Sequence, residues 1–110
     1  MQLHWSAGYL KVTTTDATTI SAKEIGDPKS ITLCNLDASG DACTIDLYLE
    51  DGGGSDTQNP IYILHDVVIP GGATLVLEHP EILYDSIAYG LVVNLTSVSA
   101  TQLLDVKVAY

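Results

Sequence analysis

The three histidines are the first residues whose chemistry could build a metal or acid–base site. His4, His65 and His79 lie far apart in the chain, and neither an HxH nor an HExxH spacing occurs. A zinc site needs three or four converging ligands, so only folding could bring these side chains together. His79, between Glu78 and Glu81, is most simply a solvated surface residue. We therefore expect no metal site and no bound cofactor.

Two cysteines, Cys34 and Cys43, could form a disulfide. If residues 38–39 are the apex of a hairpin, the two cysteines lie opposite each other across the strand pair. A disulfide needs both sulfur atoms on one face, but Cys34 is out of phase with Ile31 and Leu33 if those side chains point inward. Packed free thiols are therefore favoured, and whether the two sulfur atoms touch stays open at this stage.

The polar stretch 51–59 is a long loop whose carboxylates could bind calcium. It contains the carboxylates Asp51 and Asp56 and three consecutive glycines. Calcium binds to flexible, carboxylate-rich loops, but the spacing here is not that of an EF-hand. We interpret this stretch as a mobile, solvated loop.

Residue patterns for covalent or acid–base catalysis are missing from the sequence. There is no Gly-x-Ser-x-Gly motif. A carboxylate pair for glycoside hydrolysis assembles in space, but sugar clefts usually gather several aromatic side chains, and here the single Trp and the tyrosines are scattered. The sequence therefore predicts a protein that is not an enzyme.

Charge and composition restrict the classes of partner. The chain of 110 residues has 14 acidic residues, four lysines and no arginine, which gives a formal net charge of −10. Nucleic acids and anionic membranes bind to basic surfaces, so neither is an expected partner. The acidic excess is most simply a well-solvated surface, and the alternative is that it steers the protein onto a basic partner. No apolar run approaches the length of a membrane span, and the first ten residues do not resemble a signal peptide, so we expect synthesis in a cytoplasm-like setting.

Alternating aliphatic and polar residues predict short strands throughout the chain. Residues 1–8 carry no clear period and are interpreted as an N-terminal arm. Because 46% of the residues are hydrophobic and there is no Phe, the core should consist of Val, Ile, Leu and Ala. The predicted strands are 9–15, 17–23, 30–36, 42–50, 61–69, 73–77, 88–96 and 102–110.

Two of these strands, 61–69 and 73–77, should form a hairpin at the centre of the core. Pro70-Gly71-Gly72 joins them with residues suited to a tight reversal. His65-Asp66 interrupts the apolar pattern of the first strand, which predicts either a β-bulge or a strand covered on both sides.

The strand at 42–50 has the clearest alternation. Cys43, Ile45, Leu47 and Leu49 share one face, and we expect the opposite, polar face to be wet. About eight short strands with regular turn signals predict one all-β domain over residues 1–110, a single β-sandwich of the jelly-roll or immunoglobulin-like type. With only four lysines to guard strand edges, open edges should be paired with neighbours or covered.

Several stretches resemble small structural proteins of tailed bacteriophages. They are TTTDATTI at 13–20, ITLCNLD at 31–37, IDLYLEDGG at 45–53 and ILHDVVIPGGATLVL at 63–77. In those proteins a V-x-I-P-x-G-x-T-L hairpin follows a strand that ends in an Asp-Gly loop. The resemblance covers roughly residues 13–78 and, more weakly, the last strand.

The resemblance implies a non-enzymatic virion component made in the host cytoplasm. Among such proteins, a free-standing sandwich of this size fits a capsid decoration (cement) protein, commonly a trimer, that binds the major capsid protein on the capsid surface and stabilises the head. A tail, neck or baseplate module is the alternative, and a glycan- or receptor-binding module is a weaker one. The expected interface residues are His4, Trp5, Asp51, Asp56 and Tyr62.

Overall fold

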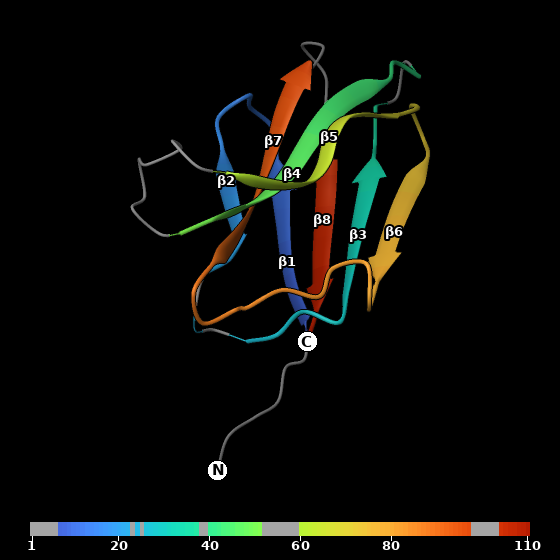
Figure 1. Ribbon diagram of the computed structural model, residues 1–110. Helices are drawn as coiled ribbons and strands as arrows, with labels where there is room; N and C mark the ends of the chain where they lie inside the picture. Colours follow the sequence, from blue (N-terminus) through green and yellow to red (C-terminus); the bar gives the residue numbers. More distant parts are fainter. Residues whose placement is uncertain (1–6, 23, 25, 38–39, 52–59, 98–103) are drawn as a thin grey trace.

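Short runs of β-branched and aliphatic residues, separated by Gly, Pro, Asp and Ser, form eight strands (Figure 1). The computed structural model describes residues 7–22, 24, 26–37, 40–51, 60–97 and 104–110. The strands are β1 (Ala7–Val12), β2 (Thr18–Ser21), β3 (Ser30–Asn35), β4 (Cys43–Glu50), β5 (Ile61–Ile69), β6 (Thr74–Glu78), β7 (Gly90–Ser97) and β8 (Leu104–Ala109). The predicted all-β class is confirmed. Residues 7 and 8, predicted to belong to the arm, are part of β1.

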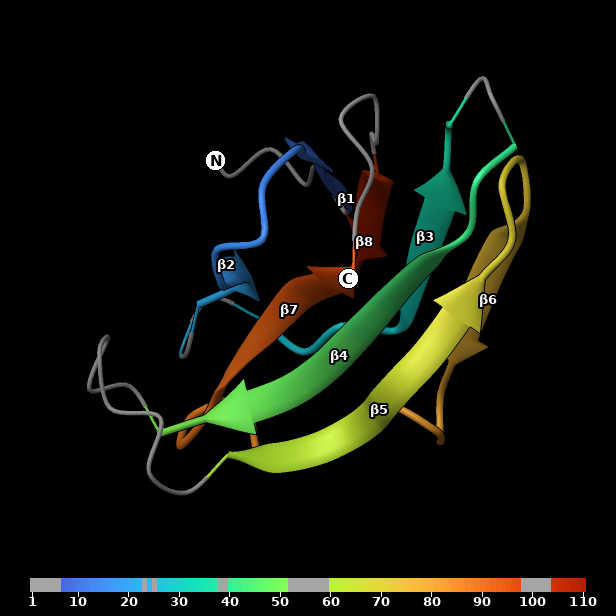
Figure 2. The same ribbon diagram turned by 90° about the horizontal axis from the view of Figure 1, so that it is seen from above.

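The eight strands form two antiparallel sheets of four that pack face to face (Figures 1 and 2). The first sheet has the order β1-β8-β3-β6, and the second has the order β2-β7-β4-β5. Among the described strands, only β4 and β5 are both consecutive in the chain and paired. An immunoglobulin-like sandwich pairs more consecutive strands within a sheet, so the chain has the jelly-roll form of the β-sandwich.

The core between the sheets is aliphatic, as the composition predicts. In β3 every second side chain is buried, and β8 repeats this alternation. Ile82, in the connection between β6 and β7, is fully buried against the same core. Each such side chain contributes about 1.5–3 kcal/mol to folding. The largest fully buried side chains on the strands are Val12, Ile31, Leu33, Ile45, Leu47, Ile69, Leu91, Val93, Leu95, Leu104 and Val108.

Strands β5 and β6 do not form the predicted central hairpin. They lie at the edges of different sheets, and the turn at residues 70–73 carries the chain from one sheet to the other (Figure 2). The turn chemistry was interpreted correctly, since Gly72 has φ of 78°. The pairing was wrong because β5 bonds to β4 and β6 bonds to β3. This segment therefore forms one border of the sandwich rather than its centre.

The buried side chain of Asn35 holds this turn against the connection between β3 and β4. Its Nδ2 donates hydrogen bonds to the backbone oxygens of Ile69 at 2.9 Å and Asp41 at 3.0 Å. Its own backbone accepts a hydrogen bond from Gly72 N at 2.8 Å and donates one to Ala73 O at 3.0 Å. One fully buried amide thus ties together two of the crossings between the sheets, the β3–β4 connection and the turn at residues 70–73.

The two crossings touch through glycines. A Cβ atom built on Gly71 would lie 2.3 Å from the backbone carbonyl carbon of Gly40. Only a residue without a side chain allows the two backbones to approach this closely. Gly71 is therefore required by packing, and its neighbour Gly72 by its φ angle.

Because β3 and β4 belong to different sheets, they do not form the hairpin in which the two cysteines would lie opposite each other. Cys34 is half-buried on the outer face of the first sheet, opposite Thr74 and Asp105. Cys43 is buried in the core on the second sheet and pairs with Ile69. Both thiols are free, as the phase of Cys34 had favoured.

The polar face of β4 is not wet, contrary to the prediction. Asp46, Tyr48 and Glu50 are only 6%, 5% and 8% exposed. Strand β4 lies between β5 and β7, and side chains on both neighbours cover its outer face. The alternation along a strand cannot show this, because it does not reveal whether the strand is central or at an edge.

Candidate functional site

Strand β5 exposes more of its side chains than its apolar sequence suggests. Ile61 and Tyr62 are each 47% exposed, and Val68 is 57% exposed. His65 and Asp66 are also exposed. These five side chains are called the β5 surface below. Strand β5, which carries them, is the outer border of the second sheet (Figure 2).

A β-bulge divides β5 in two, which confirms the first of the two predicted alternatives. Ile45 of β4 pairs with Val67, and Leu47 pairs with Leu64, so His65 and Asp66 together face the single residue Asp46. Asp66 has φ of 54°, in the left-handed region that aspartate tolerates better than most residues. The second alternative, a strand covered on both sides, is ruled out by the exposed side chains of β5.

Buried Asp46 fixes the bulge by hydrogen bonding. Its Oδ1 accepts a hydrogen bond of 2.8 Å from the backbone N–H of Asp66. The same oxygen lies 3.0 Å from His65 Nδ1. His65 Nε2 lies 3.5 Å from Asp66 Oδ2, so the imidazole stands between a buried and an exposed carboxylate. These contacts fix the positions of His65 and Asp66 within the β5 surface.

Three rings extend the cluster along the sheet. The ring centroids of Tyr62 and His65 are 4.7 Å apart, and those of Tyr62 and Tyr48 are 5.5 Å apart. Both pairs are tilted, at distances typical of favourable aromatic contacts. Burial raises the pKa of Tyr48, and the negative charge of nearby Glu50 raises it further. The buried phenol therefore stays neutral beneath the exposed ring of Tyr62.

The strands of the second sheet carry three carboxylates and one histidine but no lysine. Asp46, Glu50 and Asp66 lie on β4 and β5, and none of the four described strands of this sheet contains a lysine. Exposed Asp51 follows directly after β4. The two lysines found on strands, Lys11 and Lys107, both belong to the first sheet. The β5 surface is therefore suited to a positively charged partner.

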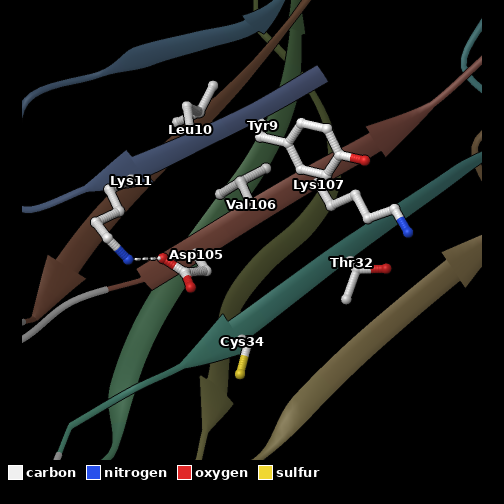
Figure 3. A pocket seen from close by; sticks show the side chains of 8 residues that line it. All are labelled: Tyr9, Leu10, Lys11, Thr32, Cys34, Asp105, Val106 and Lys107. Carbon is white, nitrogen blue, oxygen red and sulfur yellow. Dashed lines mark hydrogen bonds and ion pairs between the residues drawn. The ribbon is translucent and has the colours of Figure 1, made fainter. Parts of the chain in front are cut away.

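The outer face of the first sheet has a shallow groove of about 410 Å3 (Figure 3). Tyr9, whose side chain is 74% exposed, stands beside Lys107, its cross-strand partner. Lys11 and Asp105 form an ion pair at the other end. The half-buried Cys34 lines the side formed by β3. The groove is mixed in character: it holds two ammonium groups and one carboxylate but no cluster of acid–base groups.

The structure describes two of the five predicted interface residues. Tyr62 lies at the centre of the β5 surface, and Asp51 is exposed at the end of β4. His4, Trp5 and Asp56 lie outside the described residues. Sequence reasoning missed Ile61 and Val68 as surface residues, because apolar residues in both phases of β5 suggested burial. The sequence offered no signal for their exposure, because an apolar strand without lysine is typical of a covered position.

Among the described residues, Asp46, His65 and Asp66 form the group whose possible metal-ligand atoms converge, all within 4.8 Å of one another. These atoms are linked to each other by the hydrogen bonds and ion pairs given above. His79 follows β6, away from this group in the chain. The expectation that the protein binds no metal stays a prediction.

The strand order and the two packed sheets define the protein as a jelly-roll β-sandwich. No protein-family model matches the chain, and no curated protein matches its sequence. Within the described residues, no helix is long and apolar enough to cross a membrane.

Proposed function

We propose that the protein is a non-enzymatic structural component of a bacteriophage virion, a capsid decoration protein that binds between major capsid protein subunits and stabilises the head. The observation that carries this proposal is the β5 surface. It combines a long strand edge without lysine guards, three exposed apolar side chains and a fixed acidic bulge. Such an edge is a contact surface for another polypeptide.

The resemblance to phage structural proteins supports the same proposal. Stretches 31–37, 45–53 and 63–77, which carry part of the resemblance, include most of β3, β4, β5 and β6. The last of these stretches forms the border where the β5 surface lies. Jelly rolls recur in viral capsid proteins, although they also occur in lectins and cupins, so the fold contributes by analogy only.

A decoration protein would act mechanically. Its rigid sandwich would bury apolar side chains such as Ile61 and Val68 against capsid subunits and raise the barrier to rupture of the shell. The acidic excess of the chain would direct it to basic regions of the capsid. Association of several copies, most simply as a trimer, would let one particle-bound unit contact several subunits at once.

Immunogold labelling of intact particles and heating of stripped particles test the proposal. We expect label over the whole head in many copies. Particles stripped of the protein should release their DNA at a lower temperature, and adding the purified protein back should restore the original temperature. Label confined to the tail, neck or baseplate would reject the decoration role in favour of a tail module. Binding to a glycan array that depends on Tyr62 would favour a receptor-binding module.

A further inference from the structure

We propose that the β5 surface binds an extended polypeptide segment, which adds to the second sheet as a further strand beside β5 and places a basic side chain next to Asp66. This inference deepens the proposed function and rests on it for the identity of the partner. It specifies how the partner is held and which chemistry the partner must carry. The argument uses edge length, exposed apolar area and charge.

Edge length favours β5 over the other three edge strands. The edges of the two sheets are β1, β6, β2 and β5. Strand β2 has four residues, β6 has five and β1 has six, whereas β5 has nine. Strand β1 also carries Lys11, a residue type that blocks pairing at edges. Strand β5 carries no lysine and has the longest edge, and the bulge at His65 and Asp66 divides its row of backbone donors and acceptors.

The apolar side chains of β5 lie where an added strand would need them. Ile61 and Tyr62 stand at one end of the strand and Val68 at the other, on either side of the bulge. In strand addition, backbone hydrogen bonds supply affinity and alternate side chains supply specificity. Strand β5 pairs regularly with β4 at 67–69 and at 61–62, and a second register shift falls between Leu64 and Tyr62. An incoming strand would extend these two segments.

Charge selects a basic segment as the occupant. The exposed carboxylate of Asp66 stands beside buried Asp46, with no lysine on the strands of the same sheet. In antiparallel pairing of β5 with a second copy, the centre of the strand falls at His65, so the two copies of Asp66 would lie close together and repel each other. The formal charge of −10 on each copy adds to this repulsion. A lysine or arginine of a different chain meets no such penalty.

Two synthetic peptides test this inference on the full chain. Each has nine residues, matching β5, with alternating threonine and valine and either lysine or glutamate at its centre. We expect the lysine peptide to shift the NMR signals of the β5 backbone amides and slow their hydrogen exchange, with a dissociation constant of about 1 mM or lower. The glutamate peptide should bind at least about tenfold more weakly. Equal binding of both peptides, or no change at β5, would overturn the inference.

Matched variants distinguish the contribution of the β5 strand edge to peptide binding from the contribution of the Asp66 charge. Val68→Lys places a guard on β5, whereas Val76→Lys places the same guard on β6, where Val76 is 52% exposed. We expect Val68→Lys to weaken binding of the lysine peptide by about tenfold or more and Val76→Lys to leave this binding unchanged. Asp66→Asn keeps the tolerance for positive φ, removes the charge and should weaken binding by about two- to fivefold. Asp16→Asn, an exposed residue before β2, is the charge control.

Capsid binding distinguishes failure of this inference from failure of the proposed function. If Val68→Lys abolishes rebinding to stripped capsids and Val76→Lys does not, strand addition at β5 and the proposed function are both supported. If capsids bind the two variants equally well, decoration holds but strand addition at β5 is wrong. If the peptide binds at β5 but capsids never bind the wild-type protein, the edge is a peptide site and the proposed function fails.

Discussion

Asp46 and Asp66, on neighbouring strands, are joined by a 2.8 Å hydrogen bond from the backbone amide of Asp66 to Oδ1 of Asp46. The donor belongs to a residue with φ of 54°, and the acceptor is a buried carboxylate. Local sequence preference alone would not hold a bulge at one position in a long edge strand. This bond fixes the position of the bulge along β5. The position of the bulge in turn decides how the exposed side chains around it are directed.

Replacing Asp46 should destabilise the fold. Asp46→Ala leaves the amide of Asp66 and His65 Nδ1 without their acceptor, so we expect the free energy of unfolding to fall by about 1–3 kcal/mol. Asp46→Asn retains an acceptor oxygen and should cost less. Urea unfolding measures both, with Asp16→Ala as the control for loss of a carboxylate. A loss for Asp46→Ala no larger than that of the control would contradict the role given to this residue.

Asn35 should be among the most sensitive positions in the chain. Its side chain donates to two backbone oxygens, at Ile69 and Asp41, and its Oδ1 accepts from Asp37 N at 3.0 Å. Asn35→Ala leaves several of these buried groups unpaired, and we expect a loss of about 2–4 kcal/mol in the free energy of unfolding. Thr32→Ala, on the outer face of the same strand, should cost less than about 1 kcal/mol. Similar losses for both variants would argue against the bridging role of Asn35.

Gly71→Ala should disrupt the contact between the two crossings. The added methyl group would lie 2.3 Å from the backbone of Gly40, so one connection must move. We expect a loss of at least about 2 kcal/mol, seen as a lower melting temperature. Gly8→Ala is the matched control, because a Cβ there meets nothing within 4 Å. A melting temperature as high as that of the control would show that the crossings separate at little cost.

Stability should fall at alkaline pH. Burial raises the pKa of both Cys43 and Tyr48 in the folded state. Above their ordinary pKa values, about 8.5 and 10, the unfolded chain releases protons that the folded chain retains, so the free energy of unfolding decreases as pH rises. Tyr48→Phe keeps the ring beside Tyr62 and should make this decrease smaller while changing stability little at neutral pH. Denaturant titrations between neutral pH and about pH 11 measure the effect, with Tyr9→Phe, an exposed ring, as the control.

The two thiols should differ in reactivity. Cys34 is half-buried in the groove of the first sheet, whereas Cys43 is 1% exposed and has a raised pKa, so little of it is thiolate at neutral pH. A charged disulfide reagent should label one thiol per folded chain and two per unfolded chain. Cys34→Ser should abolish labelling of the folded protein. Rapid labelling of that variant would show that Cys43 is reached from solvent in the folded state.

The positions of the strands could be predicted from the sequence because they depend on local properties. Alternation of aliphatic and polar residues, together with Gly, Pro and Asp at turns, placed every described strand close to its observed bounds. The bulge at His65 and Asp66 was also predictable, since two consecutive polar residues break the apolar pattern of β5. The aliphatic core was predictable from composition alone, because the chain is rich in aliphatic residues and contains no Phe.

Pairing was decided only in the tertiary structure. The turn at 70–73 has the chemistry of a tight reversal, and nothing local shows whether its two strands bond to each other or to β4 and β3. The answer depends on contacts between residues far apart in the chain, such as those of Asn35 with this turn. These contacts place β5 at an edge and so turn an apolar strand into a surface.

Burial on the second face of a strand was likewise a tertiary outcome. Asp46 and Tyr48 look solvated in the alternation of β4, yet β5 and β7 cover them. The sequence by itself determined that this chain makes a two-sheet aliphatic sandwich with an acidic surface. The tertiary structure decided which strand lies at the open border and which carboxylate is buried beneath it, because burial depends on the neighbours that long-range packing brings to each side chain.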